Sequence, residues 1–402
     1  MEMTLRRQRR AVATIFAVHG AAAGTFAARI PSIAEHLHLS AGELGLALFM
    51  PSAGALLIMP FTGRAIHALG PRRALRLLFA LFCAALALPA VMPSLALLCV
   101  ALFICGATAG TSDVAMNAQG SALESRMGTS IMSSLHGMWS VGGFVAAAIA
   151  TVATRFDVGA PVHLAVMAAI LLVAGQLVVR VLPADGAGRA EAPVERPRFG
   201  LPSGIVLVIG LVGFCAVFGE LAGSDWSAVY MRDVMHSGHA TAAATYGVFA
   251  ALMAVGRLTG DRVVRRFGAA TTVRVSALVG TAGMVLVILA LATPVTIVGF
   301  ALLGIGIATV VPLVFAAAGR IGTEGGHASA GNAIAGVATI AYGAGLAAPG
   351  AIGGLAGATS LTWSFVLVGA MVGSVVLIGG ALSPRAGRVS STDEAEPIPV
   401  EA

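Results

Sequence analysis

The chain contains no lysine, and charged residues of any kind are scarce. Only 10% of its 402 residues are charged, and all 24 basic residues are arginine. An ordinary soluble domain carries about 25% charged residues. Together with a hydrophobic fraction of 58% and a mean hydropathy of +0.93, this scarcity excludes an ordinary soluble enzyme and predicts an integral membrane protein.

Other absences exclude further classes of protein. The four cysteines lie in apolar runs without CxxC spacing, which predicts neither a disulfide framework nor a metal site. The sequence has no Walker loop, no HExxH motif and no nucleophile elbow, so we expect no enzymatic activity and no cofactor. The net charge of +6 comes from short loops between apolar runs, a distribution that argues against nucleic acid as a partner.

Twelve apolar stretches recur along the chain, each near the ~20 residues that a helix needs to cross a bilayer. The predicted spans are residues 11–29, 42–62, 74–92, 95–119, 131–153, 161–181, 204–223, 241–260, 273–291, 295–317, 332–354 and 362–382.

The arginines predict the topology of these spans. With a cytoplasmic N-terminus, 21 of the 24 arginines fall on the cytoplasmic side, and Arg257 is counted in that group. Only Arg29, Arg155 and Arg232 fall on the outer side. Because positive charge is retained in the cytoplasm, the distribution predicts a multi-pass protein of the cytoplasmic (inner) membrane with both termini cytoplasmic.

A polar segment rich in Pro and Gly, residues 184–202, separates the sixth span from the seventh. It predicts a flexible cytoplasmic linker between a six-helix bundle at residues 1–183 and a second at residues 203–382. The acidic segment 383–402 predicts a disordered cytoplasmic tail.

The two halves also resemble each other in sequence. A shift of about 200 residues sets Thr62–Gly70 beside Thr259–Gly268. Because each half has an even number of spans, the halves share one orientation and form a parallel repeat. The predicted fold class is therefore an all-α membrane protein with twelve transmembrane helices in two pseudo-symmetric six-helix bundles.

The loop after the second span resembles the signature G-x-x-x-D-R-x-G-R-R of the major facilitator superfamily, with His67 at the acidic position. The matching residues are Gly63, His67, Gly70, Arg72 and Arg73 in the first half, with Gly260, Asp261 and Arg262 as their counterparts in the second. The resemblance implies a two-bundle transporter fold in which this loop braces the cytoplasmic side of one conformational state.

Four further segments are similar to a bacterial branch of that superfamily near the fucose permeases. They are Ala28–Ile33, Ser112–Gln119, Ser134–Gly143 and Ser224–Asp233. This similarity implies transport of a sugar or a related small polar solute.

Asp113 places an ionisable group inside the fourth span. A carboxylate in an apolar segment is costly unless it is paired, hydrated or protonated, so we predict that it lies on an ion or substrate path. The alternative is a polar contact that holds two helices together. Asn117 lies one turn further on and is expected to hydrogen-bond the carboxyl or a passing solute.

Three residues on other spans are candidates for the same path. His136 is expected at a depth similar to that of Asp113, where it shares a proton with the carboxyl or simply bonds a neighbouring helix. Trp139, one turn on, faces either a solute or lipid. Glu220 is expected ~27 Å along the seventh span, near the outer boundary, as a proton-coupling acid, an interfacial gate or a solvated acid.

Arg29 and Asp225 fall at matching outer positions of the first and seventh spans. One hypothesis is an outer gate in which they form an ion pair beside Trp226 when the protein faces inward. The alternative is two separate charges at the lipid headgroups, with Trp226 in the aromatic belt.

Tyr246, Asn332 and Tyr342 are further candidates for hydrogen bonds to a solute. Together these residues predict a monomeric secondary transporter that moves a small organic solute by alternating access, coupled to protons, with lipid as its surroundings. Proton-driven efflux of drug-like or amphipathic metabolites is the alternative. A non-transporting membrane sensor or assembly partner is the alternative from another class.

Overall fold

The computed structural model describes residues 2–129, 131–182, 204–324 and 327–382, and within them every regular element is a helix. Twelve helical segments are long and apolar enough to cross a membrane, which confirms the predicted fold class. The predicted linker at 184–202 and the predicted tail at 383–402 lie outside the described residues.

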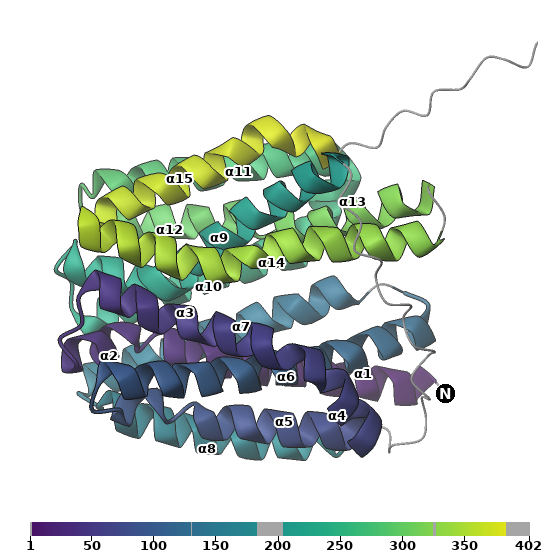
Figure 1. The fold of residues 1–402 in the computed structure, drawn as a ribbon, viewed down its shortest axis with the longest axis horizontal. Coiled ribbons are helices and arrows are strands. Elements are labelled where there is room, and N and C mark those ends of the chain that lie inside the picture. The colour runs from purple at the N-terminus through teal and green to yellow at the C-terminus, as the bar shows by residue number, and fades with distance from the viewer. Residues whose placement is uncertain (1, 130, 183–203, 325–326, 383–402) are drawn as a thin grey trace, which may run out of the picture.

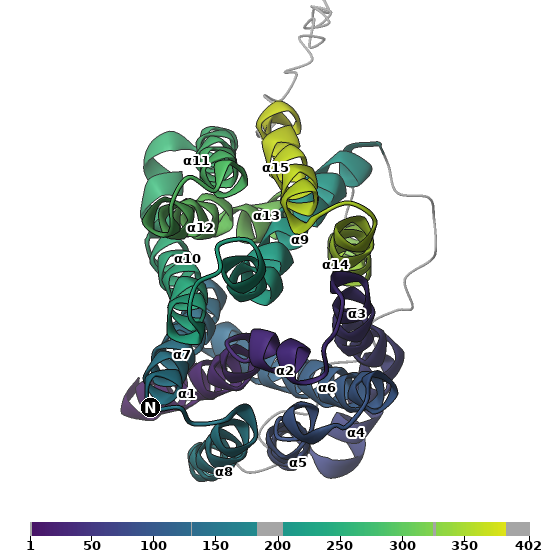
Figure 2. The same cartoon turned by 90° about the vertical axis from the view of Figure 1, so that its left-hand side faces the viewer.

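In the described residues the first half forms eight α-helices that lie together in Figure 2, and we call them the N-terminal bundle. They are α1 (Glu2–Ala27), α2 (Ile30–His36), α3 (Ala41–Ile58), α4 (Thr62–Leu69), α5 (Pro71–Ala85), α6 (Leu95–Met127), α7 (Met132–Arg155) and α8 (Ala160–Val179).

The second half forms the C-terminal bundle. Its helices are α9 (Gly204–Asp233), α10 (His239–Phe267), α11 (Ala269–Leu289), α12 (Thr293–Ile307), α13 (Val310–Glu324), α14 (His327–Ala358) and α15 (Leu361–Ile378). A break at Ala308 and Thr309 divides the tenth span into α12 and α13.

The long helices run between two ends of the molecule (Figure 1). We call the end with the N-terminus and the turns α4–α5 and α10–α11 the motif end. The opposite end carries α2 and the connections α7–α8 and α9–α10, and we call it the latch end.

Glycine forms the same sharp turn in both halves at the motif end. Gly70 between α4 and α5 has φ 80° and Gly268 between α10 and α11 has φ 79°. Side chains rarely tolerate this conformation, so the two turns require glycine. Beyond the first turn, Arg72 donates hydrogen bonds to the carbonyls of Val179 and Arg180 at the end of α8, which ties α5 to α8.

Serine begins α3 at the latch end. The Ser40 hydroxyl accepts from the Glu43 amide at 3.3 Å, and the Glu43 carboxylate accepts from the Ser40 amide at 2.8 Å. This capping box fixes the first turn of α3.

The bundles share an apolar core in the latch half but not in the motif half. One buried cluster joins Leu44 and Ala147 of the N-terminal bundle to Trp226, Tyr230 and other residues of the C-terminal bundle. Toward the motif end, each bundle has a separate cluster made of its own residues. In the described residues, burial of apolar surface therefore holds the bundles together at the latch half.

Two helix pairs make most of the contact between the bundles, α3 with α14 and α7 with α10. The two helices of the first pair approach closely at Gly45 and Gly353. A Cβ atom on Gly353 would overlap the Cα of Gly45 and lie 2.8 Å from the carbonyl oxygen of Ala41. The two backbones can meet only because neither position carries a side chain.

We therefore expect Gly353→Ala to destabilise the protein by about 1–3 kcal/mol, because the added methyl overpacks the α3–α14 contact. Thermal unfolding of the purified protein measures this effect. Gly354→Ala is the matched control, because a Cβ at Gly354 meets open space. Equal melting temperatures for the two variants would contradict the proposed contact.

Candidate functional site

An ion pair between α9 and α10 lies at the centre of the candidate site. One terminal nitrogen of Arg257 lies 2.7 and 2.9 Å from the two carboxylate oxygens of Glu220. The other terminal nitrogen donates to the Ser140 hydroxyl on α7 at 3.0 Å. The Arg257 and Glu220 side chains are only 9% and 24% exposed. A mostly buried charge pair of the C-terminal bundle is thus bonded directly to the N-terminal bundle.

This pair corrects two predictions. Arg257 was counted with the arginines of the cytoplasmic side, but it lies inside α10, which continues to Phe267, and it pairs with Glu220. Glu220 was expected near the outer boundary of a short span, but α9 has 30 residues and continues to Asp233, about 20 Å beyond Glu220. Glu220 therefore lies near the middle of its helix and not near its end.

Asp113 lies on the side of the N-terminal bundle that faces the C-terminal bundle. It is half-buried on α6, and the Asn117 side-chain amide donates to its main-chain oxygen at 2.9 Å. The Tyr342 phenol on α14 is within electrostatic range of Asp113, Glu220 and Arg257. Tyr342 is 62% exposed, and its ring packs against Phe315 at 5.9 Å between centroids. Tyr342 is thus close to both Asp113 and the central ion pair, and we call these four residues the central polar cluster.

His136 lies beside the central ion pair. Its imidazole is within electrostatic range of Arg257 and Glu220, and its ring meets that of Phe16 edge-on at 5.4 Å between centroids. In the described part of the chain, no hydrogen bond joins His136 to Asp113. The structure therefore does not contain the predicted shared proton.

Sequence reasoning missed His19, which is buried on α1. The Trp139 indole donates to its Nδ1 at 3.1 Å, so the other ring nitrogen carries the proton. That nitrogen faces the Ser112 hydroxyl at 3.1 Å, directly before Asp113 in sequence. The Trp139 N–H is therefore engaged inside the bundle and does not face lipid. A histidine in an otherwise apolar first span was the signal that could have identified this network.

The predicted ion pair between Arg29 and Asp225 is wrong in this structure. Arg29 Nε donates to His163 Nδ1 at 3.1 Å, and Nη2 donates to the Val158 carbonyl at 2.9 Å. Asp225 accepts from the adjacent Ser224 hydroxyl at 2.9 Å. Helix α1 ends at Ala27, and the turn that follows directs the Arg29 guanidinium toward α8 of its own bundle.

The alternative for these residues, exposure to the lipid headgroups, is also wrong. Arg29 is 2% exposed, and Trp226 is 1% exposed within the apolar core that the bundles share. Trp226 therefore helps to close the latch half by packing and does not lie in an aromatic belt.

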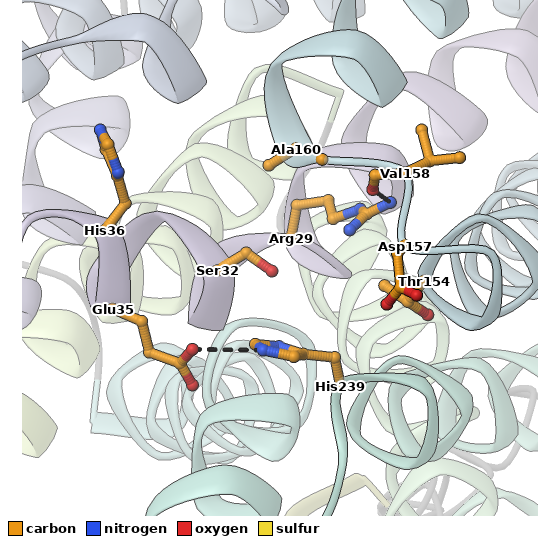
Figure 3. Close-up of a pocket in the computed structure, with 10 residues that line it drawn as sticks. Arg29, Ser32, Glu35, His36, Thr154, Asp157, Val158, Ala160 and His239 are labelled. Atoms are coloured by element: carbon orange, nitrogen blue, oxygen red, sulfur yellow. Dashed lines mark hydrogen bonds and ion pairs between the residues drawn. The ribbon is translucent and has the colours of Figure 1, made fainter.

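A different polar contact joins the bundles at the latch end. Glu35 on α2 pairs with Arg232 on α9 at 2.7 Å and with His239 at the start of α10 at 3.2 Å. The Glu35–His239 contact is drawn in Figure 3. We call these three residues the latch. Its members belong to segments far apart in sequence, so no local pattern identified them.

Tyr246 is buried where α10 meets α1 and α7. Its phenol oxygen lies 3.0 and 3.1 Å from the points where Cβ atoms on Gly24 and Gly143 would stand. It is also within electrostatic range of Asp225 and Glu220. The side chain of Asn332 lies outside the described part of the structure.

The loop motif lies away from this cluster, at the motif end. The motif residues exposed there are Gly63, His67, Arg73, Asp261 and Arg262. Gly260 is buried, and a Cβ atom on it would lie 2.7 Å from Thr309.

Twelve membrane-crossing helices in two bundles, with charged residues between them near mid-helix, define the protein as a polytopic membrane transporter. The family model of the Major Facilitator Superfamily matches residues 12–349. The chain belongs to the Major Facilitator Superfamily.

Similar proteins agree with this assignment. A protein of Sinorhizobium fredii named as an uncharacterized transporter is 36% identical over 383 residues, which cover 93% of this chain and 97% of the relative. An uncharacterized MFS-type transporter of Yersinia pestis is 33% identical over 376 residues, which cover 92% and 93%. The membrane protein MosC of Rhizobium meliloti is 31% identical over 316 residues, which cover 78% and 76%.

Solved structures share the fold at low sequence identity. A crystal structure of a mutant of the nucleoside transporter NupG superposes with a TM-score of 0.72 at 10% identity, covering 93% of this chain and 99% of that one. A bacterial homolog of the human lysosomal transporter Spinster, described as inward-facing and unoccupied, gives a TM-score of 0.71 at 13% identity, covering 95% and 97%.

The central ion pair predicts a non-additive effect on stability. Arg257→Met leaves Glu220 without its partner, and we expect a loss of about 3 kcal/mol. The double variant Arg257→Met/Glu220→Leu should recover most of that loss, because a matched apolar pair leaves no charge unpaired. Unfolding measurements on the single and double variants test this expectation.

Arg265→Met is the control for this cycle, because Arg265 is exposed on the same helix near the motif end. It should leave the stability unchanged. Additive losses in the double variant would show that Glu220 and Arg257 do not stabilise each other.

Proposed function

We propose that the protein is a secondary active transporter that moves a small organic solute across the cytoplasmic membrane by alternating access. The observation that carries the proposal is the Glu220–Arg257 pair bonded to Ser140, because it couples a buried charge to the contact between the bundles. Such a linkage allows a change of charge to alter how the two bundles hold together.

The arrangement of the apolar cores supports the conformational part of the proposal. The bundles share a core in the latch half and have separate cores toward the motif end. The excess of arginine in the loops of the motif end favours a cytoplasmic location for that end and for both termini. With this orientation, the core that the bundles share lies on the outer side, which supports a conformation closed toward the outside.

Protons are the coupling ion that this cluster suits best. A proton on Glu220 would remove the charge that holds Arg257 and would convert a charge-assisted contact into a weaker one. Arg257 would then be free to reorient, and its bond to Ser140 on the other bundle would be free to break. Asp113, half-buried and facing α14, is a second group whose neutralisation would ease passage through an occluded state.

The substrate we propose is a small polar organic solute, carried by a monomer with no enzymatic step. The groups available to bind it are the Tyr342 phenol and the His136 imidazole, near the ion pair, and the Asn117 amide beside Asp113. These groups offer hydrogen bonds from both bundles, so one solute could contact each bundle at the same time.

Proton flux in proteoliposomes tests the coupling. With a panel of sugars, polyols, amines and carboxylates outside, at least one solute should drive proton movement in the wild-type protein. Asp113→Asn should reduce that flux by about tenfold or more, because it removes a proton acceptor from the cluster. Asp157→Asn is the control, since Asp157 is an exposed acid in the α7–α8 connection. Unchanged flux in Asp113→Asn would remove Asp113 from the mechanism.

A disulfide tests the alternating movement of the bundles. The ideal Cβ position of Gly345 on α14 lies 3.8 Å from the Cβ of Ser52 on α3, which is within the range of disulfide-bonded cysteines. In a background without the four native cysteines, oxidised Ser52→Cys/Gly345→Cys should stop transport, and reduction should restore it.

The matched control for this experiment is Ser52→Cys/Gly343→Cys, because a Cβ on Gly343 meets nothing within 4 Å. It should stay reduced and active. Full transport by the crosslinked Ser52→Cys/Gly345→Cys protein would show that α3 and α14 need not separate.

A further inference from the structure

Arg29 is a buried cation without a counter-charge. Its two hydrogen-bond partners, the His163 ring and the Val158 carbonyl, are neutral. In the described part of the chain, no carboxylate lies within 4.0 Å of its guanidinium. A buried guanidinium is unfavourable unless an opposite charge or a full set of hydrogen bonds compensates it. The two hydrogen bonds of Arg29 supply no such opposite charge.

The partner of Arg29 leaves a second donor unsatisfied. Because His163 Nδ1 accepts from Arg29, the ring is neutral and its Nε2 carries the proton. That Nε2 is buried and has no hydrogen-bond partner. Such groups are rare in proteins and call for an explanation. Arg29 therefore has an uncompensated positive charge, and the adjacent His163 has an unsatisfied hydrogen-bond donor.

A pocket of about 430 Å³ opens beside Arg29 at the latch end. Figure 3 shows Arg29 directed toward Val158, where the chain enters α8, with the Ser32 hydroxyl on the opposite side of the guanidinium. Gly159 and Ala160 also line the pocket. The pocket therefore borders both the buried cation and the beginning of a long helix.

The start of α8 adds positive potential to the same place. The helix has 20 residues, and its N-cap residue Gly159 has no side chain to accept from the first-turn amides. Pro161 in this turn has no N–H, so the first-turn donors are the N–H groups of Ala160 and Val162, and Ala160 lines the pocket. These N–H groups and the positive end of the helix dipole favour an anion. This feature is independent of Arg29, and the two converge on one pocket.

The two acids that line the pocket do not neutralise Arg29. The Glu35 carboxylate is already paired with Arg232 and His239. Asp157 is exposed, and it forms no ion pair with Arg29 in the described residues. Water screens the exposed Asp157 carboxylate, whereas the charge of the buried Arg29 guanidinium is not compensated.

We propose that this pocket binds a small anion, such as chloride or a carboxylate group, against Arg29 and the first-turn amides of α8. The anion supplies the counter-charge that the protein itself does not provide. The site is separate from the central polar cluster and does not depend on the transport mechanism.

Anion-dependent thermal stability of the purified full-length protein tests the proposal. Sodium chloride and sodium acetate are titrated separately into anion-poor buffer. We expect a saturable rise of about 1–3 °C in the melting temperature of the wild-type protein. A response to chloride alone assigns the site to an inorganic ion, and a response to acetate assigns it to a carboxylated solute.

Variants locate the response. Arg29→Met should abolish it. Arg155→Met should keep it, because Arg155 is an exposed arginine at the latch end of α7 and does not line the pocket. Ser32→Leu fills the pocket while it leaves Arg29 in place, so it should also abolish the response even if Arg29→Met does not fold. Asp113→Asn, in the central cluster, should respond as the wild type does.

No saturable rise in the wild type would overturn the proposal. An undiminished rise in Arg29→Met or in Ser32→Leu would also overturn it, as would loss of the rise in Asp113→Asn, which would place the anion at the central cluster.

Discussion

A charge inside an apolar bundle has to be paired, and this requirement governs the centre of the molecule. Glu220 and Arg257 satisfy each other within the C-terminal bundle, and the remaining donor of Arg257 reaches Ser140 in the other bundle. Because the guanidinium has donors on several sides, one residue can complete an ion pair and an inter-bundle hydrogen bond at once. A change in the charge or the hydrogen bonds of Glu220 or Arg257 would therefore alter the contact between the two bundles. His136 of the N-terminal bundle and Tyr342 of the C-terminal bundle are within electrostatic range of this pair, and Tyr342 is also within range of Asp113.

The rest of the fold sets which end of the molecule stays closed. Small residues let α3 approach α14 at Gly45 and Gly353, and large buried residues such as Trp226 and Tyr230 fill the latch half. Toward the motif end, each bundle has its own buried apolar cluster in the described residues. The latch contacts of Glu35 are partly exposed and individually weak. Packing therefore supplies most of the closure, and the latch supplies alignment.

The two arginines that the sequence misplaced show where local patterns fail. Arg257 was assigned by a rule that counts positive charge near the ends of spans, and that rule cannot recognise a charge that is paired inside a helix. Arg29 was matched with Asp225 because their positions correspond in the internal repeat, yet the break after α1 turns its side chain toward His163. In both cases the partner lies on another helix, at a distance that spacing along the chain does not encode. The same reason explains why His19, hydrogen-bonded to Trp139 and close to Ser112, was missed.

The sequence by itself determined the number of spans, the helical class and the parallel repeat, because these follow from the length of apolar runs and from the distribution of charge. It also singled out Asp113, since a carboxylate among apolar residues stands out without any knowledge of its neighbours. Only the tertiary structure decided which groups meet: Glu220 with Arg257 and Ser140, Arg29 with His163, and Glu35 with Arg232. The hydrophobicity of a segment is a property of its own residues, so the sequence reveals which segments are buried. An ion pair or hydrogen bond between helices depends on the rotation and depth of both helices, which only the packing of the bundle fixes.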